Sequence, residues 1–488
     1  MQIPMRSRDS GGGQEKALIS VRTFLLGAGI LVFLLAASGI LGRVLPSGQF
    51  EYRVEADGSR YVIPGTYREV PRPDYPAWRW FTAPVESLWG PDAALVLQLS
   101  VLFFMIAGAM KLLNHAGVLT EIVTRVGIRF GDRRFRLVAA MVLFCMAIGA
   151  LVGIFEESLL ILPVALALAR RFRWDPVTGI AISFMATGFG FSAAITNPWS
   201  IGVAQRVVGL PAYSGSWLRI LFFLAVYAVT VTYLLLAIRR KERRTPHPTP
   251  YMEGEEYDWS TRMSSDPRMT RAVRWFAASM LIMVAIPLAL TFIPPVAGLS
   301  LPIMTLLYVV AGFGTALRSG LAGGRSVRLF LRGGAEALPG VVLVLIAVGV
   351  KTVMMNSEVL DTILYRAAEA MEGRSGVASL YLAFGLIVLL EFFMSSASGK
   401  AVLVMPLTVP LVQLVGGGLT LQSLVLAFQI GDGFTNVLFP TSPVLLIALG
   451  MASVGYPRWL RFILPLQGLI LLLSFGFMAL AVLVGYGP

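Results

Sequence analysis

Long apolar stretches separated by short polar segments make up most of this 488-residue chain. Most of these stretches approach or exceed the roughly 20 residues that a helix needs to cross the hydrocarbon core of a bilayer. The clearest ones span residues 24–42, 93–110, 218–238, 275–293, 299–317, 340–350 and 462–486. Helices are the expected solution in lipid because their backbone groups pair within the segment. The pattern therefore predicts an all-α polytopic membrane protein with about 10–14 membrane segments.

The composition and the charge distribution agree with that class. Hydrophobic residues make up 56% of the chain and charged residues only 14%, whereas a typical soluble domain is about 25% charged. The formal net charge is +13, but the arginines stand in short blocks between apolar stretches, which is the positive-inside pattern of a membrane protein. A nucleic-acid partner, which needs a solvated basic face, is therefore not expected. The single cysteine, Cys145, excludes an intrachain disulfide, and no Cys/His pattern indicates a zinc site or another cofactor.

The basic blocks also predict which segments face the cytoplasm of a cell-membrane protein. The tail 1–19 carries basic residues and is placed inside. The first transmembrane half spans 20–238, and its polar segment 43–92, rich in proline, tyrosine and tryptophan, is expected to form an extracytoplasmic loop. A proline-containing linker of low hydrophobicity, 239–274, is placed in the cytoplasm and leads to the second transmembrane half, 275–488.

One motif occurs in both halves with the same internal spacing. Pro163 precedes a Gly-x-Gly-Phe-Ser sequence that begins at Gly188, and Pro406 precedes, at the same distance, a Gly-x-Gly-Phe-Thr sequence that begins at Gly431. A repeat of this length in so apolar a chain is typical of membrane transporters, in which two related halves surround one site.

Loops at equivalent positions of the two halves carry different charge. The chain after Lys111 is rich in arginine, whereas acidic residues predominate after Lys351. The basic turn at 170–173 likewise corresponds to the uncharged turn at 415–420. Under the positive-inside rule the two halves therefore cross the membrane in opposite directions, which predicts an inverted repeat.

Each half contains two places where helical regularity is interrupted. One precedes the shared proline, at 153–158 and 395–400, and the other includes or follows the glycine motif, at 187–200 and 431–443. Glycine, proline and small hydroxyl residues at membrane depth predict re-entrant hairpins and broken helices. The free amide and carbonyl groups at such helix ends can bind a carboxylate and a small cation.

Five charged residues lie deep in apolar surroundings, where a charge is expensive and therefore indicates function. They are Glu156, Glu157, Glu391, Lys400 and Asp432. Two interpretations stay open for Glu157 and Lys400, which occupy the same repeat position. Either they line the path of the substrate or coupling ion together with Asp432, or they pair with each other and hold the hairpins together. Glu391 follows a long apolar run, so an interface position is a further alternative for it.

Together the breaks and the charges define a predicted site. The expected substrate-binding residues are Glu157, Ser158, Thr196, Asn197, Ser398, Gly399, Lys400, Asp432, Thr435, Asn436, Thr441 and Ser442. The coupling ion is expected to be Na⁺ or H⁺. A sodium ion would lie near Gly188, Asn197, Gly431 and Asn436.

Three segments resemble a known family. Residues 431–436 read Gly-Asp-Gly-Phe-Thr-Asn and are followed by Phe-Pro-Thr-Ser at 439–442, residues 398–401 read Ser-Gly-Lys-Ala, and residues 197–202 read Asn-Pro-Trp-Ser-Ile-Gly. The chain thereby resembles the anaerobic C4-dicarboxylate carrier (DcuC) family, in its YfcC-like branch, over nearly its whole length apart from the linker and the long loop. The resemblance implies a secondary carrier of the ion-transporter superfamily, with paired hairpins and broken helices, whose substrates are dicarboxylates or amino acids.

The chain is therefore predicted to be a secondary active transporter of small carboxylate-bearing metabolites, ion-coupled or exchanging, of an elevator or other alternating-access type, and a homodimer in the membrane. Amino acids are slightly favoured over dicarboxylates, because the deep acidic residues outnumber Lys400 and would repel a dianion. A passive channel is the alternative, since inverted repeats also form pores. An enzyme is not expected, because Gln429 replaces the first glycine of the membrane aspartate-protease pattern and the chain has only two histidines.

Overall fold

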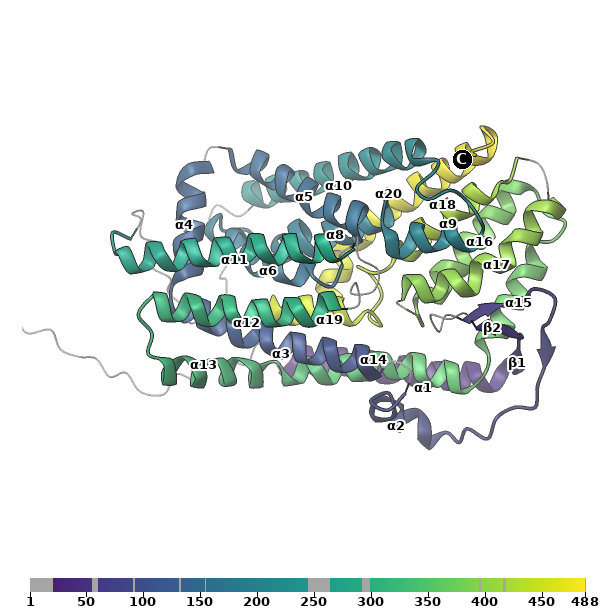
Figure 1. The fold of residues 1–488 in the computed structure, drawn as a ribbon, viewed down its shortest axis with the longest axis horizontal. Helices are drawn as coiled ribbons and strands as arrows, with labels where there is room; N and C mark the ends of the chain where they lie inside the picture. Colours follow the sequence, from purple (N-terminus) through teal and green to yellow (C-terminus); the bar gives the residue numbers. More distant parts are fainter. Residues whose placement is uncertain are drawn as a thin grey trace, which may run out of the picture.

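A computed structural model describes residues 21–54, 60–90, 93–130, 133–153, 155–244, 264–291, 299–394, 396–415 and 418–487. The tail 1–19 and the central part of the predicted linker, 245–263, lie outside these residues. Helices dominate the structure, and most of them run along its long axis (Figure 1).

The first half consists of long helices and of several shorter helical pieces. The elements are α1 (Val21–Val44), α2 (Trp78–Glu86), α3 (Ala93–His115), α4 (Val118–Phe130), α5 (Arg134–Val152), α6 (Ser158–Arg171), α7 (Pro176–Ile180), η2 (Ala181–Met185), α8 (Ala186–Ser192), η3 (Pro198–Gly202), α9 (Val203–Val207) and α10 (Ser216–Arg244), where η marks a π-helical turn. Helix α10 thus continues into the beginning of the predicted linker.

The second half repeats this order from α14 onward. Its elements are α11 (Pro267–Thr291), α12 (Ser300–Arg318), α13 (Gly323–Glu336), α14 (Leu338–Asn356), α15 (Leu360–Met371), α16 (Gly376–Glu391), α17 (Ala397–Val415), α18 (Leu421–Phe434), α19 (Pro443–Met451) and α20 (Tyr456–Leu483). The series α3 to α10 corresponds in order to α14 to α20, with a broken helix before the last long helix in each half.

Several helices are long and apolar enough to cross a membrane. Within the described residues six reach that length and three shorter ones are similarly apolar. Their outer faces carry large apolar side chains that no other part of the structure covers; Leu472, for example, is 70% exposed. Such a surface is stable in lipid and not in water. The prediction of an all-α polytopic membrane protein is confirmed.

Two groups of helices can be distinguished by their packing. In the framework group, α1 and α2 pack on α14, α3 packs on α12 and α13, and α11 packs on α12. Small residues allow the close approach of α3 and α13, because a Cβ on Gly333 would lie 2.7 Å from the carbonyl oxygen of Ala107. In the hairpin group, α5 packs on α8, α16 on α18 and α10 on α20. Figure 1 shows α1, α3, α13 and α14 along one edge and α5, α10 and α20 along the other.

The two halves interlock within the hairpin group. Helix α6 of the first half packs on α19 of the second, and α17 of the second half packs on η3 and α9 of the first. Each half therefore places one hairpin arm against the broken helix of the other half.

The described parts of the segment 43–92, residues 43–54 and 60–90, fold against the second half. They form two small antiparallel sheets, β1 (Gly48–Gln49) with β4 (Arg68–Glu69) and β2 (Tyr52–Val54) with β3 (Arg60–Val62). Helix α15 anchors them, because Asp361 accepts hydrogen bonds from the Tyr52 hydroxyl (2.6 Å) and the Phe50 backbone N–H (3.0 Å). The ring of Tyr67 stacks on Tyr365 with a centroid distance of 4.1 Å.

Candidate functional site

The first hairpin turns beside the first broken helix. Helix α5 ends at Val152, and Gly153 follows with a left-handed backbone (φ 76°). A Cβ at Gly153 would also lie only 2.2 Å from Asn197 Oδ1, so glycine is required there for both conformation and space. The backbone N–H of Ile195 donates to the Ala150 carbonyl (2.8 Å), which fixes the interruption to the end of α5.

The two broken helices restart in the same way. In the first half Asn197 precedes Pro198 and its Oδ1 accepts a hydrogen bond from the Trp199 N–H (2.9 Å). In the second half Ser442 precedes Pro443 and caps α19 from the equivalent position. Proline suits the first helical position because its missing N–H has no partner there in any case. The interruptions predicted from glycine and proline are therefore present in the structure.

The two copies of the glycine motif touch each other. A Cβ on Gly433 of α18 would lie 2.3 Å from the backbone nitrogen of Ser192 at the end of α8. The Ser192 hydroxyl donates to the Ile430 carbonyl across this contact (2.9 Å). A Cβ on Gly188 would likewise lie 2.3 Å from Val437, next to Asn436 in the chain. Gly433 lets the two helices cross with their backbones in contact, and Gly188 leaves room for the Val437 side chain.

A buried ion cluster lies beside this crossing, and we call Glu391, Lys400 and Asp432 the charge triad. Lys400 is fully buried, Asp432 is 1% exposed and Glu391 is 5% exposed. The Lys400 ammonium lies 2.8 Å from Asp432 Oδ1, forms a second ion pair with Glu391 and donates to the Met394 carbonyl (2.8 Å). One ammonium therefore serves two carboxylates from α16 and α18.

The helix termini do not favour the charges of this triad. Lys400 lies in the first turn of α17, where the helix dipole disfavours a cation, and Glu391 is the last residue of α16, where it disfavours an anion. The two residues compensate each other across the tip of the second hairpin. A position so unfavourable for each charge alone is typical of a functional site.

Buried polar atoms without a hydrogen-bond partner gather at the interruptions. Among the described residues they include Ser158 Oγ, Asn197 Nδ2, Ser200 Oγ, both side-chain atoms of Gln429, Asp432 Oδ2, Thr435 Oγ1 and Thr441 Oγ1. Such groups are rare in folded proteins because each costs about 1–3 kcal/mol when left unpaired. Donors and acceptors are both present, as a polar ligand with two kinds of group requires.

Other predicted site residues are engaged with their own surroundings. The Thr196 hydroxyl donates to the Leu151 carbonyl (3.0 Å), and Asn436 Nδ2 donates to the Asp432 carbonyl (3.3 Å). Ser398 and Gly399 lie in the first turn of α17 beside Lys400, and the Gly399 N–H donates to the Ser396 hydroxyl (3.3 Å). These residues shape the hairpin tip and the breaks around the triad.

Glu157 and Ser158 are not members of the triad. They line a cavity of about 20 Å³ together with Met280 of α11 and Met304 of α12. No ion pair joins Glu157 to Lys400 in the part of the chain that the structure describes, and Lys400 pairs with Glu391 and Asp432 instead. The interpretation that Glu157 and Lys400 hold the hairpins together is therefore wrong. Equivalent positions of two repeats are related by symmetry, and this alone does not bring them into contact.

Two buried charged residues lie outside the site that the sequence predicted. Glu391 is a member of the triad, and its signal was a carboxylate at the end of an apolar run shortly before Lys400. Arg219 lies within the stretch 218–238 and is fully buried. It donates to the carbonyls of Ile195, Tyr213 and Ser214, so it ties the first interruption to the loop before α10.

Among the described residues, no cluster of carboxylates surrounds the predicted sodium positions. In the residues described here, no group of three or more His, Cys, Asp and Glu side chains could hold a metal ion. Gly188 faces Val437 and Gly431 faces Ile387 of α16. A sodium ion at these positions would depend on carbonyl, hydroxyl and amide oxygens.

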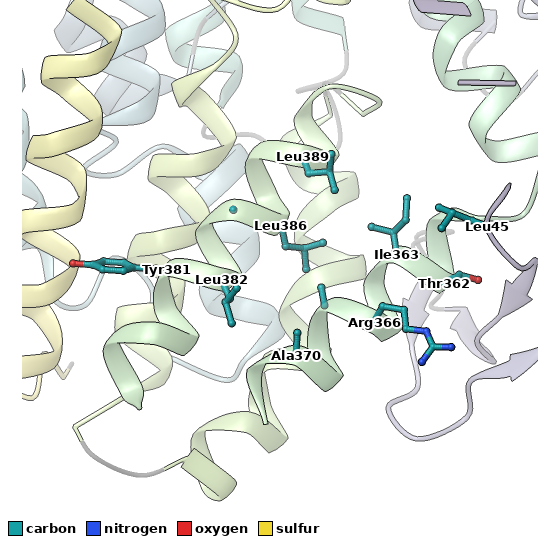
Figure 2. Close-up of a pocket in the computed structure, with 11 residues that line it drawn as sticks. Leu45, Thr362, Ile363, Arg366, Ala370, Tyr381, Leu382, Leu386 and Leu389 are labelled. Atoms are coloured by element: carbon teal, nitrogen blue, oxygen red, sulfur yellow. The ribbon is translucent and has the colours of Figure 1, made fainter. Parts of the chain in front are cut away.

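A larger cavity, of about 410 Å³, lies away from the triad, between α15 and α16. Figure 2 shows Leu386 and Leu389 of α16 facing Ile363 of α15 and Leu45 across it. Its lining is almost entirely apolar, so it lacks the polar groups that a charged metabolite needs.

A model of the family described as C4-dicarboxylate anaerobic carrier (DcuC) matches residues 26–483. A protein of Escherichia coli strain K12 described as a putative basic amino acid antiporter, YfcC, is 26% identical over 492 aligned positions, covering 94% of this chain and 96% of its own. A Haemophilus influenzae protein described as uncharacterized is 24% identical over 418 positions, covering 85% of this chain and 80% of its own.

Two solved transporters are also similar in structure. The YdaH transporter of Alcanivorax borkumensis gives a TM-score of 0.42 at 20% identity, covering 96% of this chain and all of that one. MtrF of Neisseria gonorrhoeae, described with a class of antimetabolite efflux pumps, gives 0.41 at 18% identity and covers 93% of this chain and 94% of its own.

Proposed function

Because the chain belongs to the C4-dicarboxylate anaerobic carrier family of membrane transporters, we propose that it is a secondary active transporter of small carboxylate-bearing metabolites. Its substrates are amino acids or C4-dicarboxylates, and transport is driven by an ion gradient or by exchange across the cell membrane. The N-terminus faces the cytoplasm.

The observation that carries this proposal is the position of the charge triad. A buried ammonium with two carboxylates lies where two broken helices cross, among polar atoms that have no partner. Burying a charge inside a membrane protein is energetically costly, and the charges found there usually serve transport. Interrupted helices at the meeting point of two halves are the usual substrate site of secondary transporters.

We infer that the substrate lies between the two interruptions. Its carboxylate binds to the hydroxyls of Thr435 and Thr441, and to Lys400 when that ammonium is released. Asn197 donates its free Nδ2 hydrogens to a further oxygen. Glu157 and Ser158 contribute from the first hairpin, and Ser398, Gly399, Thr196, Asn436 and Ser442 shape the site.

An amino acid suits this site better than a dianion. With all three members ionised the triad carries one excess negative charge, which repels a second carboxylate and attracts an amine or guanidinium. The E. coli relative is described as a putative antiporter of basic amino acids, and the family by its dicarboxylates, so both classes need to be tested.

The division into two groups of helices supports a mechanism of alternating access. We propose that the hairpin group moves against the framework group and carries the site across the membrane, in the manner of an elevator. Helices α4 and α15 connect the two groups in the chain and act as the arms. A homodimer would hold the framework group still.

Counterflow in proteoliposomes tests the proposal. Vesicles loaded with arginine, or with succinate, are diluted into medium with the labelled compound, and a transient accumulation is expected for the substrate class. Uptake that neither saturates nor shows counterflow would identify a passive channel instead. Lys400→Ala should abolish the accumulation, while Leu472→Ala, on the lipid-facing surface, should leave it intact.

A further inference from the structure

We propose that Glu391 binds the coupling proton: a carboxylate of the substrate replaces the Glu391 carboxylate on Lys400, and the released Glu391 takes up one proton. This inference rests on the proposed function and names its coupling ion and the residue that carries it. It assigns a role to a residue outside the predicted site.

The geometry makes Glu391 the exchangeable partner of Lys400. Asp432 lies in the last turn of α18, a helix that is buried along almost its whole length, and its backbone carbonyl accepts a hydrogen bond from the Asn436 side chain. Glu391 is the last residue of α16, where the helix dipole disfavours its charge, and α17, which carries Lys400, begins at Ala397. A small movement of the tip therefore separates Glu391 from Lys400 without displacing α18.

Charge balance favours a proton as the compensating ion. The empty triad contains two carboxylates and one ammonium, for a net charge of one negative. When a substrate carboxylate takes the place of Glu391 on Lys400, the Glu391 carboxylate stays buried without its cation. A proton on Glu391 neutralises this unpaired carboxylate, whatever charge the rest of the substrate carries.

The steps balance in atoms and charge. The ion pair between Glu391 and Lys400 breaks, a proton from the aqueous side binds to the Glu391 carboxylate, and the substrate carboxylate forms the new ion pair with the ammonium. On release the substrate leaves Lys400, the proton leaves Glu391, and the original ion pair forms again. The substrate and the proton thus travel together.

The other charged groups around the tip are few. Lys351 of α14 is a further charged residue, and it interacts electrostatically with Lys400. On α15, Asp361 accepts hydrogen bonds from Tyr52 and Phe50, and Glu369 pairs with Arg366 (3.0 Å). Neither of these two carboxylates takes the place of Glu391 as a partner of Lys400. Helix α20, which also packs on α16, has its charged residues only at its beginning.

Infrared difference spectra between alkaline and acidic buffer test the protonation without any substrate. The full-length protein in detergent should show the carbonyl band of a carboxylic acid on acidification. The chain has 27 Asp and Glu residues, so this band has many components, and one of them should be missing in Glu391→Gln and shifted in Glu391→Asp, which keeps the carboxyl group. The matched control is Glu336→Gln, which removes a carboxylate paired with Lys111 in the framework group and should keep the component that Glu391→Gln loses. Identical bands in wild type and Glu391→Gln would overturn the proposal.

Proton uptake on binding tests the exchange itself. Arginine and succinate are added separately to wild-type protein in weak buffer with a pH dye, and one proton should be taken up for each molecule bound. Glu391→Gln should bind the same probe without proton uptake, and its uptake rate should lose its pH dependence, whereas Glu336→Gln should behave as wild type. Wild-type binding without proton uptake would refute the exchange while leaving the transport function intact. Failure of both probes to bind would refute the proposed substrates, and the infrared experiment would still decide the protonation of Glu391.

Discussion

The hydroxyl of Ser192 donates a hydrogen bond to the backbone carbonyl of Ile430 across the contact between α8 and α18 (2.9 Å). The bond joins the ends of two helices from different halves of the chain, at the glycine motif that both halves share. It fixes the place where the broken helices meet and therefore the place where their free ends can act on one ligand.

The close contact at this crossing predicts a strong effect of a single methyl group. Gly433→Ala places its Cβ 2.3 Å from Ser192 N, and backbone atoms cannot yield as a flexible side chain does. Overpacking of this kind costs about 1–3 kcal/mol, so the melting temperature in detergent should fall and counterflow should be lost. Gly476→Ala is the matched control, because nothing lies within 4 Å of its Cβ. Equal melting temperatures of the two variants would refute the crossing.

The charge triad predicts that stability and transport can be separated. Lys400→Met leaves Glu391 and Asp432 buried without their cation, which should destabilise the protein by about 3–5 kcal/mol. Glu391→Gln, Lys400→Met and Asp432→Asn combined remove all three charges, so most of that stability should return.

Transport should not return in the combined variant, because the ammonium and its carboxylates would all be absent. Thermal unfolding and counterflow, measured on the same preparation, check both parts. A combined variant that still accumulates arginine or succinate would show that the triad is only structural.

The interruptions could be predicted from the sequence because their causes are local. Proline cannot donate a backbone hydrogen bond, and Asn197 and Ser442 before Pro198 and Pro443 form helix caps that neighbouring residues alone determine. The apolar stretches and the repeated spacing also follow from the chain without knowledge of the packing.

The partners of Lys400 could not be predicted in this way. They depend on how α18 crosses the second hairpin, and no periodicity in the sequence encodes that crossing. The shared repeat position suggested Glu157 instead, and this was wrong. The docking of 43–92 on α15 was missed for a similar reason, since strands of two or three residues leave no readable alternation and the bond from Tyr52 to Asp361 joins distant parts of the chain.

The side chain of Asn197 predicts a further separation between folding and binding. Its Oδ1 caps η3, and its buried Nδ2 has no partner. Asn197→Ser keeps a capping oxygen and loses the amide Nδ2 that reaches the substrate, so stability should change little while substrate affinity falls. Asn197→Ala loses the cap as well, which should cost about 1 kcal/mol. Thermal unfolding and binding of labelled arginine or succinate distinguish the two roles. Wild-type affinity in Asn197→Ser would exclude Asn197 as a ligand for that compound.

A pH-dependent contribution to stability is expected from Asp175, at the turn before α7. It caps α7 by accepting from the Val177 N–H (2.9 Å), and it pairs with Lys241 of α10 and with Arg458 of α20 (2.5 Å). Burial alone would raise the pKa of Asp175, but the Lys241 and Val177 hydrogen bonds and the charges of Lys241 and Arg458 together lower this pKa below its ordinary value. The carboxylate thus ties the last long helices of both halves to the first broken helix.

The sign of the pH effect follows from that lowered pKa. The folded-state pKa lies below the unfolded value of about 3.9, so the stabilisation is complete above that pH and is lost as the pH falls through the folded-state pKa. Asp175→Asn should therefore lower stability by about 1.5–3 kcal/mol at neutral pH, and the difference from wild type should disappear in strong acid. Thermal unfolding of both proteins over a pH series measures this. Asp266→Asn is the control, because Asp266 caps α11 through the Arg268 N–H (2.8 Å) in an exposed position and should show a smaller loss. A constant difference between Asp175→Asn and wild type at every pH would contradict the ion pairs with Lys241 and Arg458.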